Sequence, residues 1–181
     1  MDFFELAANR YSCRKFSDKP VEQDKIDRIL KAALLAPTAH NYQPFHIWVI
    51  NDEASVGKLS SITKNTFGAK LFFVVGGRKD EGWIRSCDQR NFQDVDASIV
   101  ATHMMLAVTE LGLGTTWVGN FNNWKLETLF PEMSDYDLVA IFPVGYPADT
   151  AKPAHLHTER KDLSKLVTFV CPAEEKEEEK A

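Results

Sequence analysis

The sequence is poor in cysteine, and its few thiols form no recognisable pattern. Cys13, Cys87 and Cys171 are odd in number, widely spaced and without a Cys-x-x-Cys pair. A disulfide framework needs paired cysteines, and a zinc site needs closely spaced ligands. We therefore expect free thiols.

Long apolar runs are missing as well. Nowhere does the chain reach the roughly 18 consecutive apolar residues that a membrane helix needs. Asp2 and Glu5 stand where a secretion signal would carry positive charge. We expect a cytoplasmic protein with no membrane partner.

No basic stripe is present either, and 21 Lys and Arg face 26 Asp and Glu, a net charge of -5. The segment 174–180 holds five acids and two lysines and so supplies -3 of that charge, which leaves about -2 for the body. This balance argues against a nucleic-acid partner but leaves room for one local anion site. We predict a single domain over residues 1–171 and a disordered acidic tail over 172–181.

One polar motif stands out near the N-terminus. Arg10, Ser12 and Arg14 follow one another at i, i+2 and i+4. In an extended segment this spacing puts all three on one side, and in a helix it still aligns the two arginines. Bidentate guanidiniums beside a hydroxyl suit a phosphate group. The alternative is that they are solvated residues linking two helices.

Hydrophobic periodicity predicts a mixed α+β chain. Helices are expected over residues 2–9, 22–35, 53–60, 94–111 and 123–130, and strands over 45–50, 71–75, 115–118, 138–144 and 166–171. The strand at 45–50 should be buried, Gly76 and Gly77 should close the second strand, and Gly112 should cap the central helix. Residues 78–93 lack periodicity and are interpreted as a lid-like segment. The last strand should pair with something distant, such as another subunit.

Three motifs occur in an order that identifies a family. They are Arg-x-Ser-x-Arg at 10–14, Ala-Pro-Thr-Ala-His-Asn-Tyr-Gln-Pro at 36–44 and Trp-Val-Gly at 117–119. From about Phe3 to Val170 the chain resembles the nitroreductase family of FMN-dependent oxidoreductases, in its compact form. The resemblance implies an α+β three-layer sandwich with a mostly antiparallel sheet. It also implies a domain-swapped homodimer with FMN at the subunit interface.

The resemblance assigns cofactor roles to the first motif and to one distant arginine. Arg10 and Arg160 match phosphate-binding positions, Ser12 adds a hydroxyl, and Tyr11 lies in the same cofactor-binding stretch. Arg14 matches the position beside the pyrimidine edge of the flavin. There it would act catalytically, because a fixed cation stabilises the negative charge that develops near N1 and O2.

The second motif matches the loop that reaches the flavin from the neighbouring subunit. Its matching residues are Pro37, Thr38, Asn41 and Gln43, with threonine where serine is usual. The alternative is that Pro37 and Thr38 only stop a helix, and that Asn41 and Gln43 make local turn bonds.

The third motif matches the segment whose main chain approaches flavin N5. Val118, Gly119 and Asn120 should line the flavin, and Gly119 permits close approach because it has no side chain. Trp117 should lie in the core. Gly112-x-Gly114 follows a helix and lacks the third glycine of a dinucleotide fingerprint, so no separate nicotinamide domain is expected.

Several other residues stay unassigned. Asn65 lies where the family often has a pyrimidine-binding asparagine, but its spacing is short. Thr158 stands where a family member sometimes has a basic residue two positions before the C-terminal arginine, here Arg160. Phosphate binding is therefore expected to be weaker or to depend on Lys161. His155-x-His157 has no third ligand at matching spacing, so no metal site is predicted.

The resemblance implies an enzyme in which NAD(P)H reduces FMN and leaves. A small-molecule electron acceptor, such as a nitroaromatic or a quinone, would then take the same place. Two alternatives stay open. One is a specialised relative, either a reductive dehalogenase or a flavin-fragmenting enzyme. The other is a flavin-storing or redox-sensing binding protein with negligible turnover.

Overall fold

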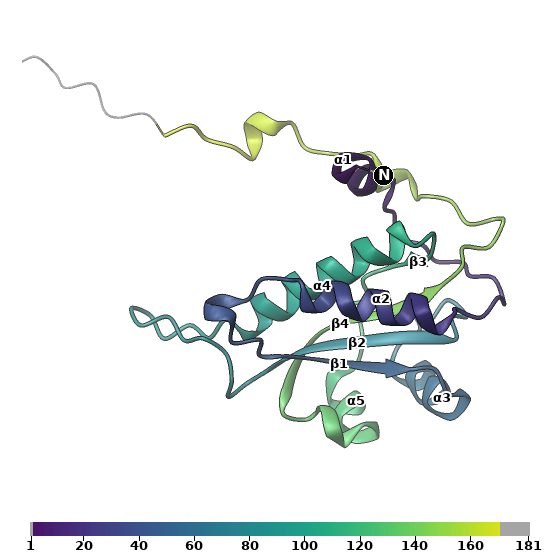
Figure 1. Ribbon diagram of the computed structural model, residues 1–181, viewed down its shortest axis with the longest axis horizontal. Helices are drawn as coiled ribbons and strands as arrows, with labels where there is room; N and C mark the ends of the chain where they lie inside the picture. The colour runs from purple at the N-terminus through teal and green to yellow at the C-terminus, as the bar shows by residue number, and fades with distance from the viewer. Residues whose placement is uncertain (1, 171–181) are drawn as a thin grey trace, which may run out of the picture.

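The computed structural model describes residues 2–170, which form a four-stranded antiparallel sheet between helices (Figure 1). The strands are β1 (Phe45–Ile50), β2 (Leu71–Arg78), β3 (Gly114–Thr115) and β4 (Tyr136–Gly145). Their order in the sheet is β1-β2-β4-β3, and every neighbouring pair is antiparallel. The predicted α+β class and antiparallel sheet are confirmed.

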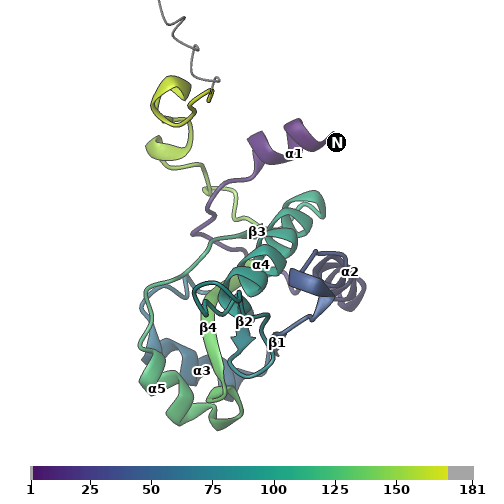
Figure 2. The ribbon, with the colours of Figure 1, turned by 90° about the vertical axis from the view of Figure 1, so that its left-hand side faces the viewer.

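Helices cover both faces of the sheet. They are α1 (Phe3–Asn9), α2 (Gln23–Leu34), α3 (Glu53–Ile62), α4 (Gln93–Glu110) and α5 (Asn123–Leu129), with short 3-10 turns at Ala39–Asn41, Pro131–Met133, His155–His157 and Leu163–Lys165. The helices α2 and α4 lie on one face and α3 and α5 on the other (Figure 2). The predicted three-layer sandwich is confirmed, with bounds close to those expected for all five helices.

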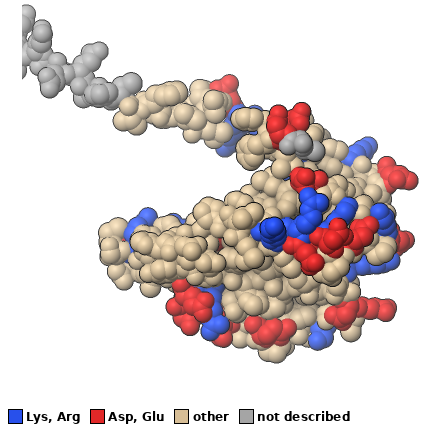
Figure 3. Space-filling model, in the orientation of Figure 1, with Lys and Arg blue, Asp and Glu red and all other residues tan. Residues whose placement is uncertain are grey.

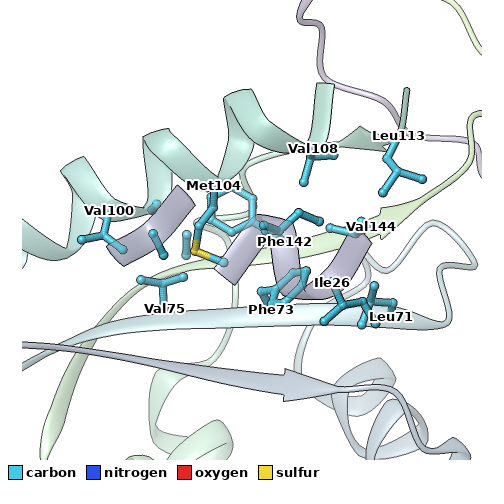
Figure 4. Close-up of a cluster of buried hydrophobic side chains, with 14 of the residues drawn as sticks. Ile26, Leu71, Phe73, Val75, Val100, Met104, Val108, Leu113, Phe142 and Val144 are labelled. Atoms are coloured by element: carbon cyan, nitrogen blue, oxygen red, sulfur yellow. The ribbon is translucent and has the colours of Figure 1, made fainter. Parts of the chain in front are cut away.

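The sequence of β2 is a continuous apolar run because the strand packs into the core on both of its faces. Leu71, Phe73 and Val75 face α2 and α4, whereas Phe72 and Val74 face the opposite layer. All five are buried because the strand is covered on both faces. Met104 and Val108 of α4 close over the first set (Figure 4).

Helix α4 is the long central element that separates the two ends of the molecule. Its 18 residues span roughly 27 Å. It ends where Gly112 takes a left-handed φ of 71°, and the Leu113 N-H returns to the Val108 carbonyl at 3.0 Å. This confirms the predicted glycine cap, and it delivers the chain directly into β3.

Three strand predictions need correction. β2 does not close at its glycines but runs through them to Arg78, with a register shift after Val75. A side chain at Gly77 would collide with the main chain of Gln93, so the glycine is required by close packing. β1 is an edge strand and only Ile50 is buried. β3 is shorter than predicted, and Val118 makes only an isolated bridge with Ile141.

The segment 78–93, interpreted from the sequence as lid-like, forms a hairpin that extends from the body (Figure 1). Ile84 and Asn91 form an antiparallel bridge, and the Phe92 N-H donates to the Trp83 carbonyl at 3.0 Å. The Trp83 ring lies edge-on to Phe92 and stacks on His40, with centroids 5.1 Å and 5.3 Å away. Trp83 and Phe92 therefore pack the base of the hairpin.

The predicted C-terminal strand is not formed within the single chain. Residues 166–170 make no strand pairing, and Phe169 and Val170 are 89% and 94% exposed. Figure 3 shows this arm projecting away from the body. Cys171 and the predicted tail at 172–181 lie outside the described residues. Over residues 2–170, none of the helices has the length and apolar character to cross a membrane.

Candidate functional site

The Arg-x-Ser-x-Arg motif follows α1 as an extended segment along β3. The chain leaves the helix at Arg10, with φ -62° and ψ 123°. Ser12 then bridges Thr115 in parallel, and the Cys13 N-H donates to the Thr115 carbonyl at 2.9 Å. Because the segment is extended, Cys13 points inward and is fully buried while its neighbours face the other side. The motif is therefore displayed as its i, i+2, i+4 spacing predicts.

A cavity of about 200 Å³, here called the arginine pocket, opens beside this segment. It is lined by Arg10, Ser12, Arg14, Ala154, Leu156, His157 and Arg160. Two segments almost 150 positions apart in sequence thus bring three guanidiniums together. None of the described lining residues is acidic, so the pocket has the charge and donor chemistry of an anion site.

The guanidiniums keep donors free for such an anion. One Arg14 nitrogen donates to the Ser12 carbonyl at 3.2 Å. One Arg160 nitrogen donates to the His157 and Glu159 carbonyls at 2.8 Å and 2.7 Å. None of the three arginines forms an ion pair with a carboxylate anywhere in residues 2–170.

Tyr11 takes a different position from its neighbours. It does not line the pocket, and its ring lies edge-on to His157 with centroids 6.4 Å apart. Partial burial raises the pKa of the Tyr11 phenol above its usual value, and the adjacent Cys13 raises it further. Tyr11 therefore supports the wall of the pocket and stays neutral near pH 7.

A second cavity of about 150 Å³, the Gly119 pocket, adjoins the first. It is lined by Arg14, Asn65, Phe67, Thr116, Trp117, Val118, Gly119 and Asn120. Arg14 lines both cavities and so lies between them, and the two cavities together are here called the groove. The structure thus places Val118, Gly119 and Asn120 next to the arginine motif.

The main-chain N-H of Gly119 is available to bind a ligand in this groove. The Val118 N-H is already bonded to the Ile141 carbonyl at 3.0 Å, whereas the Gly119 N-H has no partner among the described residues. A side chain added at Gly119 would meet nothing closer than the Trp117 ring nitrogen at 4.0 Å. It would project into space that the rest of the chain leaves free. The glycine therefore suits close approach by a ligand.

Two assignments in this groove differ from the predictions. Asn65, which sequence spacing left unassigned, lines the Gly119 pocket, and its amide lies 3.5 Å from the Asn120 carbonyl. The Asn65 N-H donates to the Thr63 hydroxyl at 3.2 Å, and that hydroxyl donates to the same Asn120 carbonyl at 2.8 Å, so two bonds hold this segment beside the groove. Trp117 is not in the core but 37% exposed at the rim, edge-on to Phe142.

The segment Pro37–Gln43 forms a loop, as predicted, at the opposite end of α4. Its Ala39 N-H donates to the buried Asp96 carboxylate at 2.9 Å. The Gln43 N-H donates to the Thr38 hydroxyl at 3.1 Å, and the Gln43 amide donates to the Asn41 carbonyl at 3.2 Å. The local turn bonds expected of these residues are present.

This loop also holds an unusual backbone. His40, Asn41 and Gln43 have φ values of 51°, 56° and 54°, in the left-handed region that non-glycine residues rarely occupy. Such conformations persist only where surrounding contacts fix them, and they concentrate at functional sites.

One chain therefore holds two separate groups of predicted site residues. Arg10, Ser12, Arg14 and Arg160 meet at the β3 end, and Val118, Gly119 and Asn120 join them through Arg14. Pro37, Thr38, Asn41 and Gln43 lie at the other end of α4, a helix whose 18 residues span roughly 27 Å (Figure 1). Both cavities are also smaller than the roughly 300 Å³ at which small-molecule sites usually begin. Neither cavity alone therefore has the usual volume of a small-molecule site.

No metal centre emerges from the described part of the chain. No three His, Cys, Asp or Glu side chains within it converge as metal ligands would. His155 and His157 share one 3-10 turn, but only His157 lines the arginine pocket.

Comparisons with known proteins agree with this architecture. Residues 7–67 and 60–146 match the Nitroreductase family. A relative from Archaeoglobus fulgidus, provisionally named NADH dehydrogenase/NAD(P)H nitroreductase, is 30% identical over 80% of this chain and 85% of its own. A relative from Thermotoga neapolitana named iodotyrosine deiodinase is 27% identical over 86% of this chain and 94% of its own.

Solved structures give the same picture. A nitroreductase family protein from Clostridium difficile 630 is 37% identical, covers 95% of this chain and 100% of its own, and superposes with a TM-score of 0.88. A structure from Exiguobacterium sibiricum described as a complex with FMN has a TM-score of 0.81. It is 18% identical and covers 94% of this chain and 98% of its own.

Proposed function

The chain belongs to the nitroreductase family of oxidoreductases, and from that membership we propose an FMN-dependent enzyme that draws reducing equivalents from NAD(P)H. Its acceptors would be nitroaromatics, quinones or similar electron-poor molecules. The observation that carries the proposal is the pair of neighbouring cavities, the arginine pocket and the Gly119 pocket, which share Arg14 as a lining residue. FMN, when bound, would supply a two-electron carrier between donor and acceptor.

The arginine pocket fits the phosphate end of FMN. A phosphate monoester brings nearly two negative charges and needs matching cations and hydrogen-bond donors. Arg10 and Arg160 would supply the cations and Ser12 a hydroxyl, and no described carboxylate in the wall opposes them. Phosphate, and not the ring system, would fix the cofactor at this end.

The Gly119 pocket fits the ring end. Arg14 would place its positive charge beside the pyrimidine edge and stabilise the negative charge that gathers there on reduction. The free Gly119 N-H would donate to the ring, and Val118 and Asn120 would line it. No side chain of the groove is required as a general acid or base.

The rest of the cofactor site is proposed to come from a second copy of the chain. Exposed apolar side chains gather on α1 and on the C-terminal arm, including Phe4, which is 82% exposed, and Phe169, which is 89% exposed. Apolar surface of this kind marks an interaction face. In a homodimer the strained Pro37–Gln43 loop of one subunit would complete the groove of the other. The charge substitution Phe169→Asp should then yield monomers in sedimentation velocity, and an unchanged dimer would refute this interface.

The decisive experiment is anaerobic mixing of the purified protein with NADH or NADPH. The protein should purify with one FMN per chain, and its flavin absorbance should be lost when the nicotinamide reduces the flavin. The absorbance should return when a nitroaromatic or a quinone is added and reoxidises the flavin. A colourless protein that fails to take up FMN would overturn the proposal, and a flavin that stays oxidised would favour storage or sensing.

A second candidate is reductive dehalogenation, which the deiodinase-named relative favours. Release of halide from a halogenated tyrosine by the reduced protein, measured against the rate with a quinone, separates the two activities. Faster halide release would make dehalogenation the better assignment.

A further inference from the structure

We propose that Asp96 is a positioning residue of the cofactor site. Its buried carboxylate holds the Pro37–Gln43 loop of one subunit in the shape that completes the groove of the other. The inference rests on the proposed function, in which this loop crosses to the second subunit. It assigns a role to a residue that lies outside all three sequence motifs.

The carboxylate of Asp96 is buried at a cost that core packing does not explain. The residue lies in the first turn of α4 and is 2% exposed. Within residues 2–170 it forms no ion pair, and its Oδ2 atom has no hydrogen-bond partner. Burying an acidic group without a cation is unfavourable, although the positive end of the helix dipole offsets part of the cost. An apolar side chain would fill this position without that cost. The acceptor itself is therefore what the position requires.

The other carboxylate oxygen makes the contact that explains its burial. Oδ1 of Asp96 accepts a hydrogen bond from the Ala39 N-H at 2.9 Å. The other hydrogen bonds described for residues 37–43 stay within the loop. Asp96 is thus the hydrogen-bonding link between the loop and the N-terminal end of α4, beside which the loop lies in Figure 1.

The strained part of the loop begins directly after this anchor. His40, Asn41 and Gln43 all have positive φ values, and such conformations persist only where surrounding contacts fix them. The other contact described there is the stack of the exposed His40 ring on Trp83, with centroids 5.3 Å apart. Without the Asp96 bond the loop would relax to ordinary backbone conformations, and cofactor binding would have to strain it again.

The expected loss of affinity follows from that strain. Holding one residue in such a conformation corresponds to a factor of roughly 5 to 150 in an equilibrium constant. Asp96→Ala should therefore weaken FMN binding about tenfold to hundredfold. Asp96→Asn keeps an oxygen acceptor for the Ala39 N-H, so its FMN affinity should stay within about threefold of wild type.

The test measures FMN affinity and amide hydrogen exchange in the same full-length holoproteins. With FMN at saturating concentration, residues 37–43 of Asp96→Ala should exchange faster than in wild type, while α4 and β2 stay protected. Asp52→Ala is the matched control, because it removes a carboxylate bond of the same 2.9 Å length, to the Ser55 N-H at the start of α3. It should keep the FMN affinity and the loop exchange of wild type.

Asp96→Ser is the second variant. A serine hydroxyl is too short to keep the loop bond but can bond within its own helix, so no orphaned acceptor is left. It should show the same faster loop exchange and weaker FMN binding as Asp96→Ala.

The two readouts separate a positioning role from a general stabilising one. Wild-type FMN affinity in the folded Asp96→Ser or Asp96→Ala protein overturns the inference. So does exchange that rises across the whole chain, because Asp96 would then stabilise the fold at large. Wild-type protein that binds no FMN overturns the proposed function, and this inference with it.

Discussion

Replacing Arg10 with alanine gives the sharpest test of the arginine pocket. Arg10 is half-buried in the pocket wall and has no carboxylate partner in the described chain, so its charge is uncommitted. Its main-chain N-H closes α1 by donating to the Leu6 carbonyl at 3.0 Å, a bond that alanine keeps. The substitution should therefore remove ligand binding with little effect on the fold.

The size of the effect follows from the chemistry of the contact. A hydrogen bond to a charged partner is worth about 1.5 to 3 kcal/mol, and the phosphate left with one fewer cation adds a further penalty. The total of about 2 to 4 kcal/mol corresponds to a loss of roughly 30-fold to 1000-fold in FMN affinity. Arg160→Ala should cost less, because Arg160 is exposed and already donates to two main-chain carbonyls.

The assay compares FMN affinity by fluorescence quenching in wild type, Arg10→Ala and Lys15→Ala. Lys15 is an exposed neighbour outside both cavities and serves as the matched control for a lost positive charge. Thermal unfolding of each variant checks the fold. A folded Arg10→Ala protein with wild-type FMN affinity would show that this pocket does not hold the phosphate.

Three other predictions address separate parts of the structure. Arg14→Ala should retain some FMN but lower the midpoint potential of the flavin and the rate at which the flavin is reduced, because Arg14 lines the Gly119 pocket. An unchanged flavin potential with weaker FMN binding would instead make Arg14 a phosphate ligand. Asp96→Ala should destabilise the fold by about 1 to 3 kcal/mol in denaturant unfolding, since it leaves the half-buried Ala39 N-H without its acceptor. Asp96→Asn should cost less because it keeps an acceptor. The Tyr146 hydroxyl lowers the pKa of Glu22 from its ordinary 4.5 to about 2, so Glu22 contributes stability above pH 4.5 that is lost as the pH falls towards 2. The melting temperature of wild type should accordingly fall more steeply across that window than that of Glu22→Gln, and parallel curves would contradict the assignment.

Local sequence was sufficient where local forces decide the structure. The apolar face of residues 22–35 predicted α2 to within about one residue at each end, and the bounds of β1 agree with the prediction. Gly112 was recognised as a cap because only glycine adopts a positive φ there at low cost. The extended spacing of Arg10, Ser12 and Arg14 likewise indicated a shared face before any fold was known.

Features that depend on contacts between residues far apart in the chain could not be predicted from local sequence. The hairpin 78–93 has no hydrophobic periodicity because contacts between its two ends hold it together. One of them is the hydrogen bond from the Asn91 amide to the Lys79 carbonyl at 2.8 Å. Asn65 is held at the groove by bonds to Thr63 and Asn120, the second of which is distant in sequence, and His157 reaches the arginine pocket only through the path of the C-terminal arm. Residues 166–170 have strand-like composition, but a strand also needs a partner edge, which composition does not specify.

The rigid span of α4 has a genetic consequence. Since it keeps the arginine pocket and the Pro37–Gln43 loop of one chain far apart, each cofactor site of the proposed dimer would draw one half from each subunit. A mixed dimer of one Arg10→Ala subunit and one loop-defective subunit would then carry both lesions in one site and neither in the other. Two proteins that are each inactive would restore one working site when their subunits exchange, as in intragenic complementation.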